Sequence, residues 1–104
     1  MGLFNVPIGV GDPQGERFQL VEALVDTGAT FTILPSPILD GLGIEPQRSG
    51  SFELADGSFR DYRIGETILR VEGEEVRSVV VFGDEEMRPI LGAVTLEILS
   101  LIHI

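Results

Sequence analysis

Short stretches in which apolar and polar residues alternate, separated by turn signals, constrain the fold of this chain most strongly. Residues 50–64 show the pattern best, because two alternating arms flank the pair Asp56-Gly57. A period of two puts apolar side chains on one face of a strand, and an Asp-Gly pair is favoured where both residues of a hairpin turn need positive φ. The sequence therefore predicts a mostly-β fold that contains hairpins.

The other expected elements follow from the same criteria. Pro7 indicates a first strand that lies at an edge or bends, and a second hairpin should turn near Gly73. Ser36 can cap a short helix, and Pro37 suits its first position. The expected strands cover residues 3–10, 17–26, 31–35 and 101–104, the hairpins residues 50–64 and 65–83, and the helices residues 36–44 and 93–99.

Length and composition exclude several classes of function. The 104 residues, 43% of them apolar, suffice for a single domain over residues 1–104 with one core. A net charge of −10, with seven Arg and no Lys, argues against binding nucleic acid, which needs a cationic surface. The chain has no Cys and a single His, so we expect no disulfide, no metal site and no cofactor.

Targeting signals are also missing from the sequence pattern. No apolar run reaches the ~18–20 residues that cross a bilayer. The first residues lack the basic and apolar regions of a signal peptide. We therefore expect no membrane partner and a cytoplasmic location.

One carboxylate stands out because of its surroundings. The stretch EALVDTGATFTILP, residues 22–35, places Asp26 directly after a continuous apolar run. Such an aspartate should be at least partly buried, and burying a charge is costly unless a partner, a hydrogen bond or a proton compensates it. Asp26 is therefore the strongest candidate for a functional residue.

An apolar strand that leads into Asp-Thr-Gly-Ala-Thr, followed by a second strand, resembles the active-site loop of retropepsin-like aspartic proteases. Three further features carry the resemblance: the hydrophobic frame around the motif, a glycine-tipped hairpin like the family's flap, and the segment PILGAVTLEIL with its glycine before a helix. The likeness extends from about Arg17 to the end of the chain. It implies a closed β-barrel with one short C-terminal helix, of the type seen in single-domain bacterial or archaeal members.

The resemblance implies an aspartic endopeptidase that works as a two-fold homodimer. Aspartic proteases are the standard example of two carboxylates that share one proton and activate a water between them. This chain offers one Asp-Thr-Gly, and the other candidate acids lack its hydrophobic frame: Asp40, Asp56, Asp61 and Asp84. The second aspartate is therefore expected from another copy of the chain. The substrates would be peptides or proteins with extended, mainly apolar segments.

Roles for individual residues come from the same resemblance. Asp26 would be catalytic, Thr27 would bond across the dimer axis, and Gly28 would let the substrate backbone approach closely. The hairpin would close over a bound peptide, and a bound peptide would pair with its backbone. The expected substrate-binding residues are Ala29, Thr30, Ala55, Asp56, Gly57 and Ile90, with Met87 or Arg88 at the rim.

Two departures from the retroviral pattern leave alternatives open. The retroviral enzymes carry an ion pair between an acid after the motif and an arginine after the later glycine, whereas this chain has Thr30 and Ala93 there. The last expected strand, over residues 101–104, is short for a dimer sheet, and His103 within it is expected to be an ordinary edge residue. A catalytically inactive dimer that binds peptides or proteins is therefore the second hypothesis. An unrelated small β-barrel with Asp26 exposed in a structural turn is the third.

Overall fold

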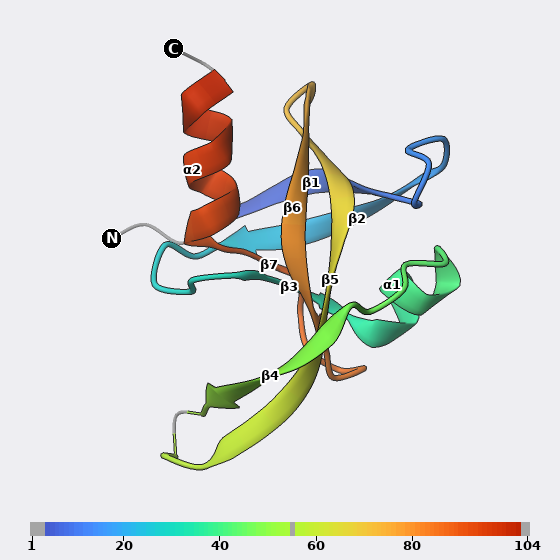
Figure 1. Ribbon diagram of the computed structural model, residues 1–104. Coiled ribbons are helices and arrows are strands. Elements are labelled where there is room, and N and C mark those ends of the chain that lie inside the picture. The colour runs from blue at the N-terminus through green and yellow to red at the C-terminus, as the bar shows by residue number, and fades with distance from the viewer. Residues whose placement is uncertain (1–3, 55, 103–104) are drawn as a thin grey trace.

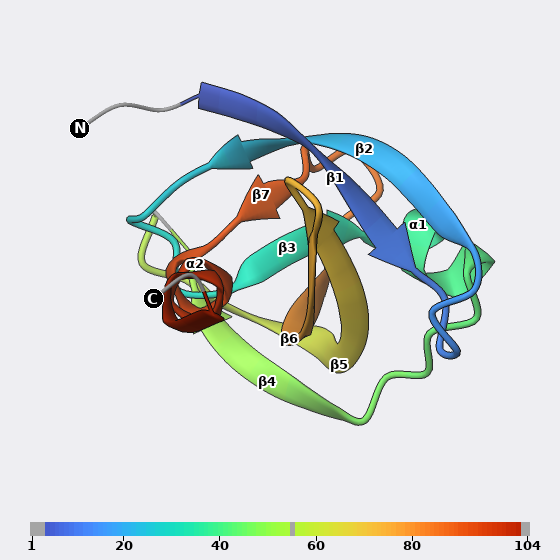
Figure 2. The same cartoon turned by 90° about the horizontal axis from the view of Figure 1, so that it is seen from above.

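Seven strands form one sheet that curls back on itself in the computed structural model, which describes residues 4–54 and 56–102 (Figure 1). The strand order is β1-β2-β7-β3-β6-β5-β4, and a further pairing between β1 and β5 closes the sheet into the expected barrel (Figure 2). The elements in chain order are β1 (Phe4–Gly11), β2 (Phe18–Val25), β3 (Thr32–Pro35), α1 (Ser36–Gly41), β4 (Arg48–Glu53), β5 (Phe59–Val71), β6 (Glu74–Gly83), β7 (Ile90–Leu91) and α2 (Ala93–Ile102).

Strand β1 makes the contact that closes the barrel. It pairs with β2 along its whole length, and its second half also pairs with β5, where Ile8 lies opposite Val71 and Val10 opposite Leu69. Ile8, Val10 and Leu69 are completely buried. These residues belong to the hydrophobic core, so the β1–β5 pairing is also part of it. Burying each large aliphatic side chain contributes roughly 1.5–3 kcal/mol to the stability of the fold.

Strand β5 belongs to both of the predicted hairpins. It runs without a break for 13 residues. Ile64 lies opposite Arg48 of β4 and also opposite Val81 of β6, so the strand changes partner at this point. A Cβ at the next residue, Gly65, would lie 3.1 Å from the Phe82 ring, which explains the glycine. The β4–β5 hairpin therefore projects from the barrel as the continuation of a barrel strand (Figure 1).

The predicted turn type at Asp56-Gly57 is wrong. The prediction requires a two-residue loop, whereas the Leu54 amide donates to the Ser58 carbonyl at 2.7 Å and closes a longer one. At this tip Gly57 has a φ of 86°, and its amide donates to the Leu54 carbonyl in a longer loop. The turn with two positive values lies in the second hairpin, at Glu72 (51°) and Gly73 (85°).

The helices begin and end differently from the prediction. Ser36 does not cap α1; it is the first helical residue, and its hydroxyl donates to the Gly83 carbonyl at 2.6 Å. α2 continues to Ile102, so the strand predicted for residues 101–104 is wrong at 101–102, and 103–104 lie outside the described residues. A helix satisfies its own backbone groups, whereas a strand needs a neighbour. Leu99 extends the face of α2 that packs on the core.

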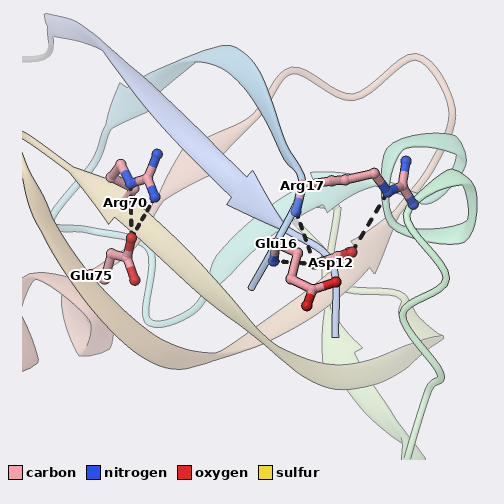
Figure 3. A network of polar contacts seen from close by, with 5 residues as sticks. All are labelled: Asp12, Glu16, Arg17, Arg70 and Glu75. Atoms are coloured by element: carbon pink, nitrogen blue, oxygen red, sulfur yellow. Dashed lines mark hydrogen bonds and ion pairs between the residues drawn. The ribbon is translucent and has the colours of Figure 1, made fainter. Parts of the chain in front are cut away.

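The turn between β1 and β2 is held by a buried carboxylate. Asp12 Oδ1 accepts hydrogen bonds from the backbone amides of Glu16 (2.8 Å) and Arg17 (3.2 Å), and Arg17 Nε lies 3.6 Å from Oδ2 (Figure 3). Burial opposes ionisation, but these amides and the guanidinium outweigh it and hold the pKa of Asp12 below its ordinary value. Figure 3 also shows Arg70 on β5, whose Nε donates to Glu75 of β6 at 3.0 Å.

The described part of the chain lacks two features that would indicate other functions. Its helices have six and ten residues, and none in residues 4–54 and 56–102 is long and apolar enough to cross a membrane. Over the same residues, no three His, Asp or Glu side chains gather where they could hold a metal ion.

Gly73→Ala should lower the free energy of unfolding by about 1–2 kcal/mol, because a residue with a Cβ pays for a φ of 85°. A Cβ at Gly73 would meet no atom within 4 Å, so the cost is backbone strain alone. Gly41→Ala is the matched control, because Gly41 also faces open space but has no positive φ, and its stability should be equal or higher. Urea denaturation measures both; an unchanged Gly73→Ala would contradict this turn.

Candidate active site

The Asp26-Thr27-Gly28 stretch forms a tight turn at the end of β2. The Asp26 amide donates to the Leu91 carbonyl, and the Ala29 amide donates to the Asp26 carbonyl, both at 3.1 Å. The Gly28 amide donates to the carboxylate Oδ1 of Asp26 at 2.9 Å. A backbone donor to a carboxylate is a charge-assisted bond and orients the group. Asp26 is half-buried, and its carboxyl group is held in one direction.

Gly92 passes directly behind this turn. A Cβ at Gly92 would lie 2.5 Å from both the carbonyl carbon and the oxygen of Phe31, and 3.0 Å from the Ala29 oxygen. No side chain fits at such distances, so only glycine allows the two segments to approach. β7 pairs with β2 on one side and with β3 on the other, which explains why Gly92, the next residue, lies against the loop between them.

The first amides of α2 complete the junction with the loop. The Ala93 amide donates to the Ala29 carbonyl at 2.8 Å, and the Val94 amide donates to the Thr30 carbonyl at 3.0 Å. The first amides of a helix have no partner inside it, so the loop carbonyls cap α2. Backbone hydrogen bonds thus join the two segments that the retroviral ion pair would connect.

Three buried hydroxyl groups connect β3, α2 and β6. The Gly92 amide donates to Thr32 Oγ1 (3.1 Å), Thr32 Oγ1 bonds to Thr95 Oγ1 (2.7 Å), and Thr95 Oγ1 bonds to Ser78 Oγ (2.8 Å). The Ser78 hydroxyl also donates to the Val79 carbonyl at 3.2 Å. Each hydroxyl can therefore donate once and accept once along the chain of bonds. Sequence reasoning missed this network.

A hollow of about 260 Å³ lies beside the turn. Residues that follow the motif line one side of it. Residues of the β4–β5 hairpin, which we call the flap, line the other side. Its walls are mainly apolar, and Glu53 is the one charged residue among the described residues that line it. The lining residues are Ala29, Thr30, Phe31, Ile33, Phe52, Glu53, Leu54, Tyr62, Val81, Gly83 and Met87.

Aromatic contacts hold the flap against the loop. The Phe52 ring on β4 lies edge-on to Phe31, with 6.2 Å between centroids, and 5.9 Å from the ring of Tyr62 on β5. Such pairs contribute only ~0.5–1.5 kcal/mol beyond their buried area. The Phe31–Phe52 contact holds the flap near the loop but is weak enough to break when the flap opens.

Hydrogen bonds around Asp56 order the flap tip. Asp56 Oδ1 accepts from the hydroxyl (2.6 Å) and the amide (2.9 Å) of Ser58, and these two bonds hold the pKa of Asp56 below its ordinary value of 3.8. The Leu54 amide donates to the Ser58 carbonyl at 2.7 Å and closes the loop. Ala55, predicted to contact substrate, lies outside the described residues.

A family comparison matches this arrangement. The family described as "gag-polyprotein putative aspartyl protease" matches residues 17–97, which include the Asp26 turn, the flap and the first half of α2. The chain belongs to this aspartyl protease family. Membership confirms the resemblance drawn from the motif. It also excludes the unrelated β-barrel of the third hypothesis, which required an exposed Asp26, whereas Asp26 is half-buried.

Solved structures of retroviral proteases share the fold. The solution structure of simian foamy virus (mac) protease matches with a TM-score of 0.67 and 18% identity, covering 93% of this chain and 96% of that one. EIAV protease in complex with the inhibitor HBY-793 has a TM-score of 0.70 and 17% identity, covering 95% and 89%. Among curated protein sequences, none matches. At these identities the likeness establishes the retropepsin-like fold.

A third similar structure is a longer protein. The foamy viral protease-reverse transcriptase in complex with an RNA/DNA hybrid matches with a TM-score of 0.67 and 17% identity. The match covers 91% of this chain but 12% of that one.

The remaining predicted site residues occupy different places in this aspartyl protease fold. Thr27 is exposed, as a contact with a second copy requires, and its bond across a dimer axis stays a prediction. Ala29 and Thr30 line the hollow, together with Met87. Ile90 does not line it; this residue is half-buried in β7, opposite Leu24 and Ile33. Arg88 donates to Asn5 at 3.1 Å, and Gly57 lies at the flap tip.

Thr95→Val should lower the free energy of unfolding by about 1–3 kcal/mol, because it leaves the buried hydroxyls of Thr32 and Ser78 with one partner fewer. Thr95→Ser keeps the hydroxyl and should lose clearly less. Thermal denaturation of both variants measures the difference. A serine variant no more stable than the valine variant would contradict the network.

The flap tip should keep its hydrogen bonds at mildly acidic pH. The depressed pKa of Asp56 means that its contribution is fully present above 3.8 and is lost as the pH falls below that value. Carboxyl titration by NMR should give Asp56 a midpoint below 3.8, and Ser58→Ala should raise that midpoint. A midpoint at or above 3.8 in the unmodified chain would contradict the Asp56–Ser58 contact.

Proposed function

We propose that this chain is an aspartic endopeptidase that hydrolyses peptide bonds in extended, mainly apolar segments and acts as a homodimer. The observation that carries the proposal is the Asp26 turn, in which the Gly28 amide orients the carboxyl group beside a hollow roofed by a flap. Family membership supports it. The structural neighbours are themselves named proteases, and the EIAV enzyme is complexed with an inhibitor.

The proposed mechanism uses two Asp26 carboxyl groups, one from each copy. One carboxylate removes a proton from a water molecule, whose oxygen bonds to the scissile carbonyl carbon, while the other, protonated, donates its proton to the carbonyl oxygen. The C–N bond then breaks, the amine nitrogen takes the proton that the first carboxylate removed, and the carbonyl forms again as its proton returns to the second carboxylate. Two of the other candidate acids are held in ion pairs elsewhere: Asp84 pairs with Arg60, and Asp40 pairs with Arg63. The second carboxyl group is therefore best supplied by a second copy.

The flap offers a backbone edge to an extended substrate. β4 lies at the end of the strand order and pairs with β5 on one side. A peptide that adds its backbone to such an edge places alternate side chains toward the protein. The apolar hollow beside Ala29 and Thr30 would then receive one of these side chains.

Mildly acidic conditions should favour activity. The catalytic pair needs one shared proton between two carboxyl groups. A dimer also carries a net charge of −20, twice −10, and repels itself less when some acids are neutral.

Asp26→Asn should abolish turnover of a mixed peptide library between about pH 4 and pH 7 while leaving the chain folded. Asp40→Asn is the matched control: it removes a carboxylate in an exposed ion pair with Arg63, which is worth ~0–1 kcal/mol, and should keep activity. A pepstatin-type inhibitor should block the wild type, and light scattering gives the mass. Full activity in Asp26→Asn would sink the assignment.

The same experiment separates the second hypothesis. A dimer that binds peptides but never turns them over would favour a catalytically inactive binding module. A monomer without turnover would mean that no second copy brings its Asp26 to the site.

A further inference from the structure

Tyr62 carries a polar group that the fold does not use. Its side chain is buried, with 9% of the residue exposed, and its hydroxyl oxygen has no hydrogen-bond partner in the described structure. Buried polar groups are nearly always paired, and leaving one unpaired costs stability. A phenylalanine would fill the same space without that cost, so the hydroxyl calls for a partner from outside the folded chain.

The position of Tyr62 indicates where such a partner would come from. Tyr62 lies on β5 opposite Gly50 of β4, and it lines the hollow beside the Asp26 turn. Its neighbour Phe52 belongs to the flap and contacts Phe31 on the loop. The hydroxyl is closed off from solvent while Phe52 rests on Phe31. A peptide can enter only if the hairpin that carries both Phe52 and Tyr62 lifts from the loop.

We propose that Tyr62 is a specificity-determining residue, whose hydroxyl donates a hydrogen bond to a neutral, oxygen-tipped side chain of the substrate that enters the hollow. A glutamine side chain is the best match. This inference rests on the proposed function, because it concerns the peptide that the Asp26 site would hold.

The walls of the hollow select this class of side chain. A volume of about 260 Å³ is below the ~300–1,000 Å³ of small-molecule pockets, so a single side chain is the fitting occupant. Phe31, Ile33 and Val81 favour an apolar stem. An ammonium group would have to leave water for these walls, and an ion pair with the exposed carboxylate of Glu53 would offset little of that cost. Glu53, the charged residue of the lining, disfavours a carboxylate and thus selects glutamine over glutamate.

The composition of the chain provides a built-in probe of this site. Tyr62 is the single tyrosine, and the chain has no tryptophan. Intrinsic fluorescence therefore reports on Tyr62 alone. A side chain that reaches the hydroxyl should change the emission, whereas a peptide bound elsewhere should not.

The test uses peptide libraries that carry glutamine, methionine or glutamate at each position in turn. Methionine matches glutamine in length but lacks the carboxamide. Binding is measured on Asp26→Asn, so that no peptide is consumed, and on the double variant Asp26→Asn with Tyr62→Phe. At one position glutamine should bind about five- to tenfold more tightly than methionine, and Tyr62→Phe should remove this preference. Tyrosine emission of Asp26→Asn should change with the glutamine peptide.

The unfolding temperature of Tyr62→Phe shows whether this variant remains folded, and the binding and turnover results test the inference and the protease proposal separately. Tyr62→Phe alone should unfold at the same temperature or a higher one, because it deletes an unpaired group. The inference would be overturned if the ratio of binding affinities for glutamine and methionine peptides were the same with and without the Tyr62 hydroxyl. It would also be overturned if no peptide changed the tyrosine emission. Wild-type turnover without the glutamine preference would overturn the inference alone. A Tyr62-dependent preference without turnover would instead overturn the protease proposal.

Discussion

The close approach of Gly92 to Phe31 fixes the position of everything around Asp26. A Cβ built on Gly92 would lie 2.5 Å from the Phe31 carbonyl, so the two backbone segments are in direct contact and neither can shift toward the other. Leu91, just before the glycine, supplies the carbonyl that holds the Asp26 amide, and the Gly92 amide is itself held by Thr32. The next amides cap α2 on the loop. The loop, the strand β7 and the helix α2 thus form one unit, and the orientation of the Asp26 carboxyl group follows from it.

This unit is held together by neutral groups. Backbone amides, carbonyls and the hydroxyls of Thr32, Ser78 and Thr95 make the described contacts that join the loop, β7 and α2, whereas the Asp26 carboxylate bonds within the loop, to the Gly28 amide. An ion pair at the same place would weaken as its acid is protonated, whereas hydroxyl and amide groups do not titrate at mildly acidic or neutral pH. Arg70 and Glu75 form an ion pair on the exposed surface of the barrel, where such pairs contribute little, and the buried Asp12 pairs with Arg17 in the separate β1–β2 turn.

Much of this arrangement could be predicted from the sequence because its signals are local. The alternation of apolar and polar residues predicted most strands, and the apolar residues around Asp26 predicted the loop that carries it. The hydroxyl network could not be predicted, because Thr32 and Thr95 are 63 residues apart and threonine is common on strands and helices alike. The turn at Asp56 failed because its carboxylate bonds to Ser58 in a longer loop, and the last strand failed because an apolar segment with no neighbour closes its hydrogen bonds as a helix.

The unbroken strand β5 has a mechanical consequence. Its C-terminal half is clamped between β1 and β6, while its N-terminal half carries the flap. A beam clamped at one end deflects most at its free end, so the tip near Gly57 should travel furthest and the base near Gly65 least. Changes at the tip would then alter how peptides enter without loosening the barrel, whereas changes at the base would be felt in both. The moving half and the fixed half belong to one strand, so the packing of the C-terminal half of β5 in the barrel sets the stiffness of the flap.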